Sequence, residues 1–358
     1  MPSDLGQLCL PPGASLRQAI ASLNANRRGI VLITDQERRL LGTLTDGDIR
    51  RAILAGQGLD QPLEALLEAK AASPYPQPIT APLGSRPAEL LGLMTRHSVG
   101  QIPLLDSQDR VADLVVMAEL MPQAQPPVRA VIMAGGFGKR LRPMTEDLPK
   151  PMLPVGGRPL MEHIVDQLKD AGIRQVHVTT HYLPEKIQEH FGDGSQFGVD
   201  LDYLCEQTPL GTAGSLGLMP TPRETLLVIN GDILTRVDFA AMLAYHRQQD
   251  ALITVGVRKL DLAVPYGVIK GQDGFVTSLE EKPTLSLFVN AGVYLLEPAA
   301  LGHLQAGQHL DMTDLITLAL AAGQPVASFP IIEYWLDIGN PADYKKANHD
   351  FGNGSVQG

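Results

Sequence analysis

The sequence predicts an α/β protein in which a duplicated module precedes a larger α/β domain with a mainly parallel sheet. Two segments about 70 residues apart share one order of apolar runs and turns. After residue 128, short apolar runs alternate with segments of helical spacing. Proline-rich residues between the two parts are typical of a stiff spacer. We therefore expect a module at 1–121, a linker at 122–127, a domain at 128–348 and a flexible tail at 349–358.

Length, charge and cysteine content narrow the class of protein. A chain of 358 residues can bury the cores of two or three domains. The net charge of −10 argues against nucleic acid or a membrane surface as a partner. The two cysteines, Cys9 and Cys205, are far apart and predict core thiols rather than a disulfide or metal site. The start of the chain lacks a signal-like segment and no apolar run has membrane-spanning length, so we expect a cytoplasmic protein.

The N-terminal module contains an internal repeat. Residues 29–35 match residues 100–106 at an offset of 71. Each copy predicts a helix, a strand, a turn, a second strand and a helix, and two copies complete one core together. Repeat 1 covers about 1–68 and repeat 2 about 78–121, with their first helices expected at 15–26 and 86–97.

Residues 40–51 read Leu-Leu-Gly-Thr-Leu-Thr-Asp-Gly-Asp-Ile-Arg-Arg and resemble the end of a CBS motif, so the module resembles a CBS pair (Bateman module). The resemblance implies that Thr45 and Asp48 hold an adenine nucleotide effector. A Thr with Asp three residues later is also a capping box, and both interpretations stay open. In the second copy Val116 and Glu119 stand at the matching positions, so one of two potential ligand sites has lost its hydroxyl.

The domain opens on a strand followed by a glycine loop. The apolar run at 130–133 leads into a glycine-rich, basic segment that contains Gly135, Gly136, Gly138, Lys139, Arg140 and Arg142. Glycines let backbone N–H groups approach an anion, and the cations add charge. Lys150 lies between two prolines that favour an extended backbone. This pattern predicts a phosphate-binding loop.

The loop fits neither a P-loop nor a dinucleotide fingerprint. Gly-Gly-x-Gly-Lys-Arg-Leu-x-Pro-x-Thr, followed by Pro-Lys-Pro, instead resembles the signature of sugar-1-phosphate nucleotidyltransferases (nucleotide-sugar pyrophosphorylases). The resemblance covers residues 128–348 and implies a Rossmann-like (GT-A type) domain that uses Mg²⁺, a nucleoside triphosphate and a sugar 1-phosphate. It implies nucleotide binding by Gly135, Gly136 and Gly138, and catalytic contacts of Arg140 and Lys150 with the triphosphate.

Alternating elements follow, and they predict where ligands bind. We expect helices at 160–171 and 184–191, and strands at 175–180 and 199–204. In an open sheet of this kind, ligands lie at the carboxyl ends of the strands.

Residues 205–215 place Glu206 just before a second glycine loop. The resemblance implies that this segment, including Gly211 and Thr212, holds the nucleobase. A carboxylate can accept hydrogen bonds from N1–H and the 2-amino group of guanine, whereas uracil and thymine offer a single N3–H. We expect GTP as the donor, and UTP, TTP or CTP remain alternatives. Glu206 could also be a solvated carboxylate at the end of a strand that binds no base.

Two later carboxylates predict a metal site. The buried strand in 226–234 ends in Asp232, and a carboxylate at a strand tip is well placed for Mg²⁺, which prefers one or two carboxylates plus phosphate oxygens. Residues 334–344 resemble the closing Trp-x-Asp-x-Gly motif of the family, which implies Asp337 as the second metal ligand. A helix is expected from Pro341.

Three short strand-like segments, 264–270, 279–283 and 289–296, resemble the sugar-facing motifs of the family. The resemblance implies that Gly267, Glu281 and Asn290 contact the sugar, and that Lys282 contacts its phosphate. Alternatively, Glu281 and Lys282 are an exposed pair on a strand and have no role in binding.

The predicted activity is transfer of GMP from GTP to a hexose or hexosamine 1-phosphate, which yields a nucleotide sugar and pyrophosphate. The alternative is a catalytically silent, nucleotide-sensing regulatory subunit, but such a subunit should have lost phosphate or metal residues that this sequence keeps. Pairing of the CBS modules predicts a homo-oligomer tuned by adenine nucleotide. No hexapeptide repeat follows the domain, so we expect no appended acyltransferase.

Overall fold

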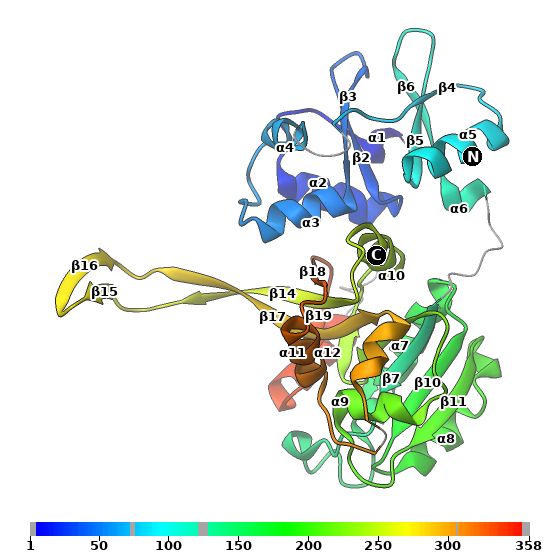
Figure 1. Ribbon diagram of the computed structural model, residues 1–358, viewed down its shortest axis with the longest axis vertical. Helices are drawn as coiled ribbons and strands as arrows, with labels where there is room; N and C mark the ends of the chain where they lie inside the picture. The colour runs from blue at the N-terminus through cyan, green and yellow to red at the C-terminus, as the bar shows by residue number, and fades with distance from the viewer. Residues whose placement is uncertain (1–4, 72–75, 121–127, 306, 353–358) are drawn as a thin grey trace. The chain divides into compact units, whose positions relative to one another are not determined.

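A computed structural model describes residues 5–71, 76–120, 128–305 and 307–352 (Figure 1). The chain divides into two compact units, Met1–Gln125 and Pro126–Gln357. The expected linker at 122–127 lies outside the described residues. The last helix, α12 (Pro341–Gly352), begins where the sequence predicts and continues into the first part of the expected tail.

The first unit repeats one fold. One sheet contains β1 (Cys9–Leu10), β2 (Ile30–Thr34) and β3 (Leu40–Thr45), and the other contains β4 (Ala81–Pro82), β5 (Gln101–Leu105) and β6 (Val111–Val116). The helices are α1 (Leu5–Leu8), α2 (Leu16–Asn26), α3 (Asp46–Leu54), α4 (Leu63–Lys70), α5 (Pro87–His97) and α6 (Met117–Leu120). The offset of 71 residues relates β2 to β5 and β3 to β6 at both ends, so the repeat is present as a structural duplication.

The two copies share one core, as expected. Ile30 and Leu32 of β2 pack in the same buried cluster as Val111 and Leu114 of β6. Arg28 of the first copy donates a hydrogen bond to the Leu114 carbonyl at 2.9 Å. Neither copy could bury these side chains alone. Removal of their apolar surface from water therefore drives the two copies to pack together.

The second unit is built on a seven-stranded sheet in the order β11-β10-β7-β12-β17-β14-β18. The strands are β7 (Val128–Met133), β10 (Gln175–Thr180), β11 (Asp200–Cys205), β12 (Thr225–Asn230), β14 (Ile253–Ala263), β17 (Thr284–Leu296) and β18 (Val326–Pro330). All neighbours are parallel except β17, which runs antiparallel to both β12 and β14. The expected α/β fold with a mainly parallel mixed sheet is confirmed.

Helices and short pairs complete the second unit. The helices are α7 (Leu160–Asp170), α8 (Pro184–Phe191), α9 (Gly211–Gly214), α10 (Phe239–Gln248) and α11 (Met312–Ala321), with 3₁₀ turns at Lys139–Leu141, Lys150–Met152, Ser195–Phe197, Ser215–Leu218 and Pro298–His303. The short strand pairs are β8 (Pro154–Val155) with β9 (Arg158–Pro159), β13 (Ile233–Thr235) with β19 (Trp335–Asp337), and β15 (Val268–Gln272) with β16 (Phe275–Glu280). The apolar positions of α7 recur at helical spacing and are buried, so packing against the sheet stabilises the helix.

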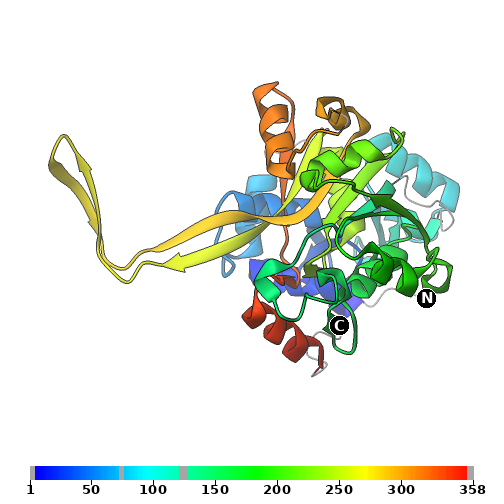
Figure 2. The same cartoon turned by 90° about the horizontal axis from the view of Figure 1, so that it is seen from below.

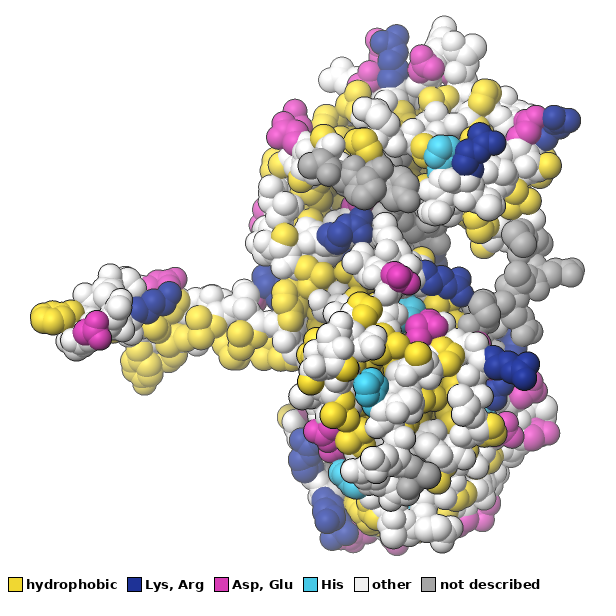
Figure 3. All heavy atoms as spheres, in the orientation of Figure 1, with side chains coloured by type: hydrophobic (Ala, Val, Ile, Leu, Met, Phe, Trp, Pro, Cys, Tyr) yellow, Lys and Arg dark blue, Asp and Glu magenta, His cyan; other side chains and the backbone are white. Residues whose placement is uncertain are grey.

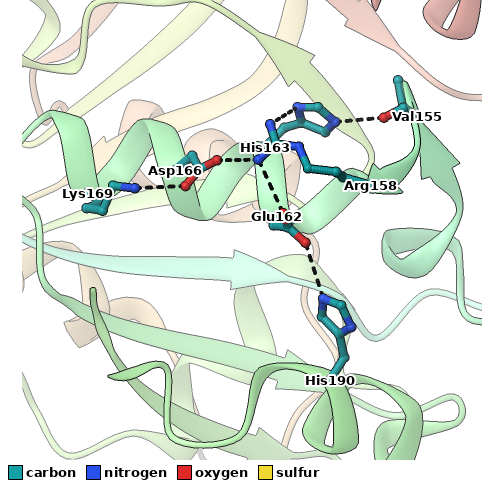
Figure 4. A network of polar contacts seen from close by, with 7 residues as sticks. All are labelled: Val155, Arg158, Glu162, His163, Asp166, Lys169 and His190. Carbon is teal, nitrogen blue, oxygen red and sulfur yellow. Dashed lines mark hydrogen bonds and ion pairs between the residues drawn. The ribbon is translucent and has the colours of Figure 1, made fainter. Parts of the chain in front are cut away.

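A polar network fixes α7 beside the segment that leads to it (Figure 4). Arg158 donates hydrogen bonds to Asp166 at 2.7 Å and to Glu162 at 3.2 Å. His163 Nε2 lies 2.9 Å from the Val155 carbonyl oxygen. These contacts connect the β8–β9 turn to the helix and hold the chain that follows Lys150.

The strands β14 and β17 continue together beyond the sheet. Their outer halves and the β15–β16 hairpin form an arm, residues 258–289, which projects away from the seven-stranded sheet in both ribbon views (Figures 1 and 2). The pairing between the two strands runs from Ile253 to Ala263 with one register shift near Val255. The arm is therefore an extension of two core strands and not a separate loop.

Candidate functional site

A cavity of about 260 Å³ lies at the carboxyl ends of β7 and β12. This is the edge where an open parallel sheet places its ligands. The lining residues are Met133, Ala134, Gly135, Gly136, Phe137, Lys150, Pro151, Thr179, Glu206, Pro209, Gly211, Thr212, Ser215, Asn230, Gly231, Asp232, His309 and Asp311.

The first glycine loop forms one wall. Gly135 and Gly136 line the cavity directly. Gly138 has φ of +62°, and an added Cβ would lie 3.0 Å from Thr145, so the turn favours glycine. Thr145 donates a hydrogen bond to the Gly138 carbonyl at 2.9 Å, which fixes the loop in this shape.

Lys150 and Asp232 meet inside the cavity, although 82 residues separate them. Lys150 Nζ lies 2.5 Å from Asp232 Oδ2, with the lysine side chain 11% exposed and the aspartate 28% exposed. Gly231 lets the end of β12 lie close to the end of β7, because an added Cβ there would lie 2.7 Å from the Met133 carbonyl oxygen. The ends of β12 and β7 can thus lie against each other.

Asp337 lies beside Asp232, because β19 pairs antiparallel with β13. Burial and the negative charge of Asp232 raise the pKa of Asp337, although Lys150 and Arg140 oppose that shift. Asp337 Oδ1 is buried and has no hydrogen-bond partner among the described residues. An orphaned carboxylate oxygen next to a second carboxylate fits a divalent cation.

Arg140 belongs to the same group. A Cβ built on Gly339 would lie 3.6 Å from Asp337 Oδ1 and 3.7 Å from Arg140 Nη1, so the guanidinium and the carboxylate share one neighbourhood. Arg140 itself is exposed. In the described parts of the chain, no group of three or more His, Cys, Asp or Glu side chains could hold a metal. A cation at the two aspartates would need further oxygen ligands from substrate or water.

Glu206 follows β11 and faces the glycine loop. Its Oε2 accepts a hydrogen bond from the Leu210 N–H at 2.8 Å. A Cβ on Gly135 would lie 2.8 Å from Oε1, so a larger residue there would displace the carboxylate from this position. Burial raises the pKa of Glu206, against a lowering by the Leu210 N–H and nearby histidines.

The second glycine loop is tied to a distant helix. Gly211 has φ of +75°, and an added Cβ would lie 2.6 Å from the Leu310 carbonyl oxygen. The Thr212 N–H donates to Asp311 Oδ1 at 3.2 Å, and Thr212 Oγ1 accepts from the Met312 N–H at 2.8 Å. The loop and the start of α11 therefore form one rigid wall of the cavity.

Several cavity residues were not predicted from the sequence. Asp311 heads a capping box that marks the start of α11. That signal locates a helix but does not place it about 100 residues away in sequence against the second glycine loop. His309, Thr179 and Ser215 also line the cavity, and no local pattern identifies them.

The expected sugar-contacting residues lie apart from the cavity. Gly267, Glu281 and Lys282 are exposed and belong to the arm. Gly267 and Glu281 are neighbours, since a Cβ on Gly267 would lie 3.0 Å from Glu281 Oε2. Lys282 has φ of +47°. Asn290 lies at the root of the arm on β17, where its Oδ1 accepts the Gly292 N–H at 3.0 Å.

In the first unit Thr45 caps α3, as one of the two open interpretations predicts. Thr45 and Asp48 form a complete capping box. Asp48 also forms ion pairs with Lys70 at 2.7 Å and Arg51 at 2.5 Å. Burial raises the pKa of Asp48, but Lys70 and the other donors outweigh that effect and hold it below its usual value.

Lys70 lines a second cavity of about 180 Å³. Its other lining residues are Leu41, Gly42, Thr43, Leu67, Ala71, Pro76, Gln77 and Pro78. The second copy lacks the hydroxyl cap, and Glu119 there forms an ion pair with Arg28 of the first copy at 2.8 Å.

One expectation about the cysteines was wrong. Cys205 is exposed at the end of β11 instead of buried in a core. Its position at the last residue of a strand, beside the cavity loop, explains the exposure. Among the described residues, no helix is both long and apolar enough to cross a membrane.

Known proteins resemble both units. Residues 129–354 match the Nucleotidyl transferase family, and residues 7–55 match the CBS domain family. A mannose-1-phosphate guanylyltransferase of Mycobacterium tuberculosis is 32% identical over 232 residues, which are 62% of this chain and 64% of that protein. A UTP--glucose-1-phosphate uridylyltransferase of Synechocystis is also 32% identical, over 62% of each chain.

The match thus spans less than two thirds of these relatives' length. A crystal structure of a putative glucose-1-phosphate thymidylyltransferase from Bacillus anthracis, in complex with a sucrose, has a TM-score of 0.52 and 26% identity. It covers 63% of this chain and 96% of its own. On the match that extends from β7 into α12, the chain belongs to the nucleotidyl transferase family and carries a CBS domain ahead of its transferase domain.

Proposed function

We propose that this chain transfers a nucleotidyl group from a nucleoside triphosphate to a sugar 1-phosphate. The observation that carries the proposal is the cavity, which brings together a glycine loop, the cation Lys150, the carboxylate Asp232 and the carboxylate Glu206. An anion-binding loop and a base-recognising carboxylate at one strand edge are the two ends of a nucleotide site.

In the proposed reaction, an oxygen of the sugar phosphate forms a bond to the α-phosphorus. The bond from that phosphorus to the bridging oxygen breaks, and pyrophosphate leaves with the electron pair. The nucleophile is already an anion, so no general base is needed. The protein must instead hold two polyanions together and stabilise the charge that develops.

Lys150 and Arg140 are suited to this task. Lys150 lies within the cavity wall, and Arg140 lies near Asp337. Both cations contact the triphosphate in our proposal. The backbone N–H groups of Gly135 and Gly136 add neutral donors that cost no reorganisation during the reaction.

For the metal we propose Mg²⁺ held by Asp232 and Asp337. When bound, the ion supplies charge neutralisation and polarises the phosphate oxygens. The buried orphan oxygen of Asp337 supports this assignment. Lys150, now paired with Asp232, would then be available for a phosphate oxygen.

The donor base we propose is guanine. Glu206 leaves Oε1 directed to the loop while Leu210 N–H occupies Oε2. An ionised carboxylate can accept both N1–H and the 2-amino group, a pairing that a uracil cannot supply. The named relatives include a guanylyltransferase and a uridylyltransferase at the same identity, so Glu206 and not sequence similarity favours guanine.

For the acceptor we propose a hexose or hexosamine 1-phosphate, contacted by Gly267, Glu281 and Asn290, with Lys282 on its phosphate. Gly267, Glu281 and Lys282 lie on the arm and do not line the cavity. An arm must therefore cover the cavity during the proposed reaction. For the CBS unit we propose an adenine nucleotide effector near Thr45 and Asp48, as the domain family suggests.

Pyrophosphate release tests the function. The protein is mixed with Mg²⁺, each of GTP, UTP, TTP, CTP and ATP, and a panel of sugar 1-phosphates. We expect turnover with GTP and one class of sugar. Turnover with another nucleotide would keep the reaction and refute the assignment of Glu206. Absence of release with every pair would refute the proposed activity and favour a nucleotide-sensing subunit.

A further inference from the structure

The arm has one apolar and one polar face. Cross-strand pairing places Leu260 opposite Leu287 and Leu262 opposite Leu285. Because these positions alternate along both strands, the four leucines share one face, and each is 42–49% exposed. On the other face Asp261 accepts a hydrogen bond from Ser286 at 2.5 Å.

The apolar surface continues to the end of the arm. Ile269 pairs with Leu279, and they are 58% and 63% exposed, while Phe275 at the tip is 78% exposed. Figure 3 shows hydrophobic atoms gathered along one side of the arm. A two-stranded ribbon is marginally stable alone in water, and exposed apolar patches above a few hundred Å² mark interaction sites.

The exposed area matches that of a dimer. Apart from Phe288, which pairs with Lys259 on the polar face, the large apolar side chains of the arm that stand exposed are Leu260, Leu262, Tyr266, Ile269, Phe275, Val276, Leu279, Leu285 and Leu287. With ~200 Å² for each fully exposed large side chain, their combined surface is on the order of 1,000 Å². A stable interface buries about 800 Å² on each partner.

The occupant is a second copy of this chain rather than the arm's own body. Beyond the register shift near Val255, the β14–β17 ladder pairs every residue from Val257 to Ala263, which holds the arm outward. Folding the arm back onto its own cavity would break ladder hydrogen bonds, whereas contact with another copy breaks none.

The cavity of one chain lacks the acceptor half of the proposed site. Lys150 is the one Lys or Arg among the described residues that line it, and Arg140 lies nearby beside Asp337. Two polyanionic substrates need more positive charge than this, and Lys282 with its neighbours Gly267 and Glu281 lies on the arm. An arm from a second copy supplies what is missing.

We infer that two copies of this chain exchange arms, so that the leucine face of each arm packs on the other copy and presents Glu281 and Lys282 to that copy's cavity. This inference rests on the proposed function for its catalytic part, and on the exposed apolar face for its association part. The two parts are measured separately.

The first test measures the mass of the full chain by sedimentation. Leu262→Asp places a charge on the leucine face, and Thr284→Asp places the same charge on the opposite face as a matched control. We expect the assembly of wild type and of Thr284→Asp to be twice the mass of Leu262→Asp. Equal masses for all three would overturn the arm as an association surface, whatever the activity.

The second test combines two inactive chains, Asp232→Ala and Lys282→Ala, coexpressed with different tags and purified through both. In such a hybrid one of the two cavities receives an intact arm, so about half of the wild-type turnover should return. No recovery in a hybrid of confirmed 1:1 composition would overturn arm exchange and favour closure within one chain. If wild type itself has no activity, the proposed function fails while the sedimentation result stands.

Discussion

Lys150 Nζ and Asp232 Oδ2 form an ion pair 2.5 Å apart at the meeting point of β7 and β12. The pair neutralises two charges that a nucleotide and a cation would otherwise engage. A divalent ion must therefore compete with an ammonium group for Asp232. Substrate phosphate removes this competition by attracting Lys150, so metal and triphosphate are expected to bind with positive cooperativity.

We expect Asp232→Asn and Lys150→Met each to lower the rate of pyrophosphate release by ~10²-fold or more, because each removes a preorganised charge from the phosphate site. Glu189→Gln, an exposed change on α8, is the matched control and should leave the rate unchanged. Near-normal turnover in either cavity variant would contradict the proposed site.

Asp337→Asn should stabilise the metal-free protein while it abolishes turnover. Folding raises the pKa of Asp337 through burial and the charge of Asp232. A carboxyl whose pKa is raised on folding costs stability at pH values above its unfolded pKa. The substitution removes this cost, which we place at about 1 kcal/mol after solvent screening, or ~2–4 °C in Tm.

Thermal unfolding at pH 7 and at acid pH measures this effect. The gain should disappear as the pH falls below the unfolded pKa of the carboxyl, because both states are then protonated in the wild type. Added Mg²⁺ should reverse the order at pH 7, since only the wild type binds it through two carboxylates. A destabilised variant in metal-free buffer would contradict the prediction.

Glu206→Gln should weaken use of GTP and favour UTP or TTP. Loss of a charged acceptor for two guanine donors costs about 1.5–3 kcal/mol, which is roughly a 10- to 150-fold fall in kcat/KM for GTP. Burial raises the pKa of Glu206, so this carboxylate becomes protonated at a higher pH than an ordinary glutamate. As the pH falls, the wild type should therefore lose its preference for GTP earlier than it would with a solvated glutamate. Donor competition assays between pH 4 and 8 measure both effects.

Gly135→Ala should raise KM for the nucleotide, because the new Cβ would lie 2.8 Å from Glu206 Oε1 and displace that carboxylate. Gly136→Ala is the matched control for folding, since its Cβ would meet no atom within 4 Å. Both variants should have similar Tm values. Equal nucleotide KM for Gly135→Ala and wild type would argue against Glu206 as a contact of the base.

Asp48→Asn should destabilise the CBS unit by about 1–2 kcal/mol at pH 7, because it removes the charge that pairs with Lys70 while Thr45 still caps α3. Folding lowers the pKa of Asp48, so its contribution is present above the unfolded pKa and is lost as the pH falls through the folded pKa. Denaturant unfolding of the full chain at several pH values measures this. Calorimetry with AMP, ADP and ATP separately tests whether the same residues bind a nucleotide.

The sequence predicted the parts of the fold that local patterns specify. The repeat offset located β2, β3, β5 and β6, and the apolar run before Gly135 located β7. Each of these segments is buried on one or both faces, and burial imposes a readable period. Asp232 and Glu206 were placed at strand ends for the same reason, and the structure brings them into one cavity.

Other features depend on contacts that no local pattern encodes. The sequence predicts strand-like segments at 264–270, 279–283 and 289–296, but it does not reveal that β14 and β17 leave the sheet together as an arm. Asp311 enters the cavity because the second glycine loop lies against the start of α11. Cys205 is exposed because β11 ends at the surface, and its apolar neighbours in sequence gave no sign of this.

The regular pairing from Val257 to Ala263 also limits how the arm can change in length during evolution. Removing one residue from β14 would turn every side chain beyond that point to the other face of the arm. Leu260 and Leu262 would then exchange faces with Lys259 and Asp261. Removing two residues from β14 and the two that pair with them in β17 preserves both faces and shortens the arm by about 7 Å. Related chains should therefore differ in arm length by matched, even steps in the two strands.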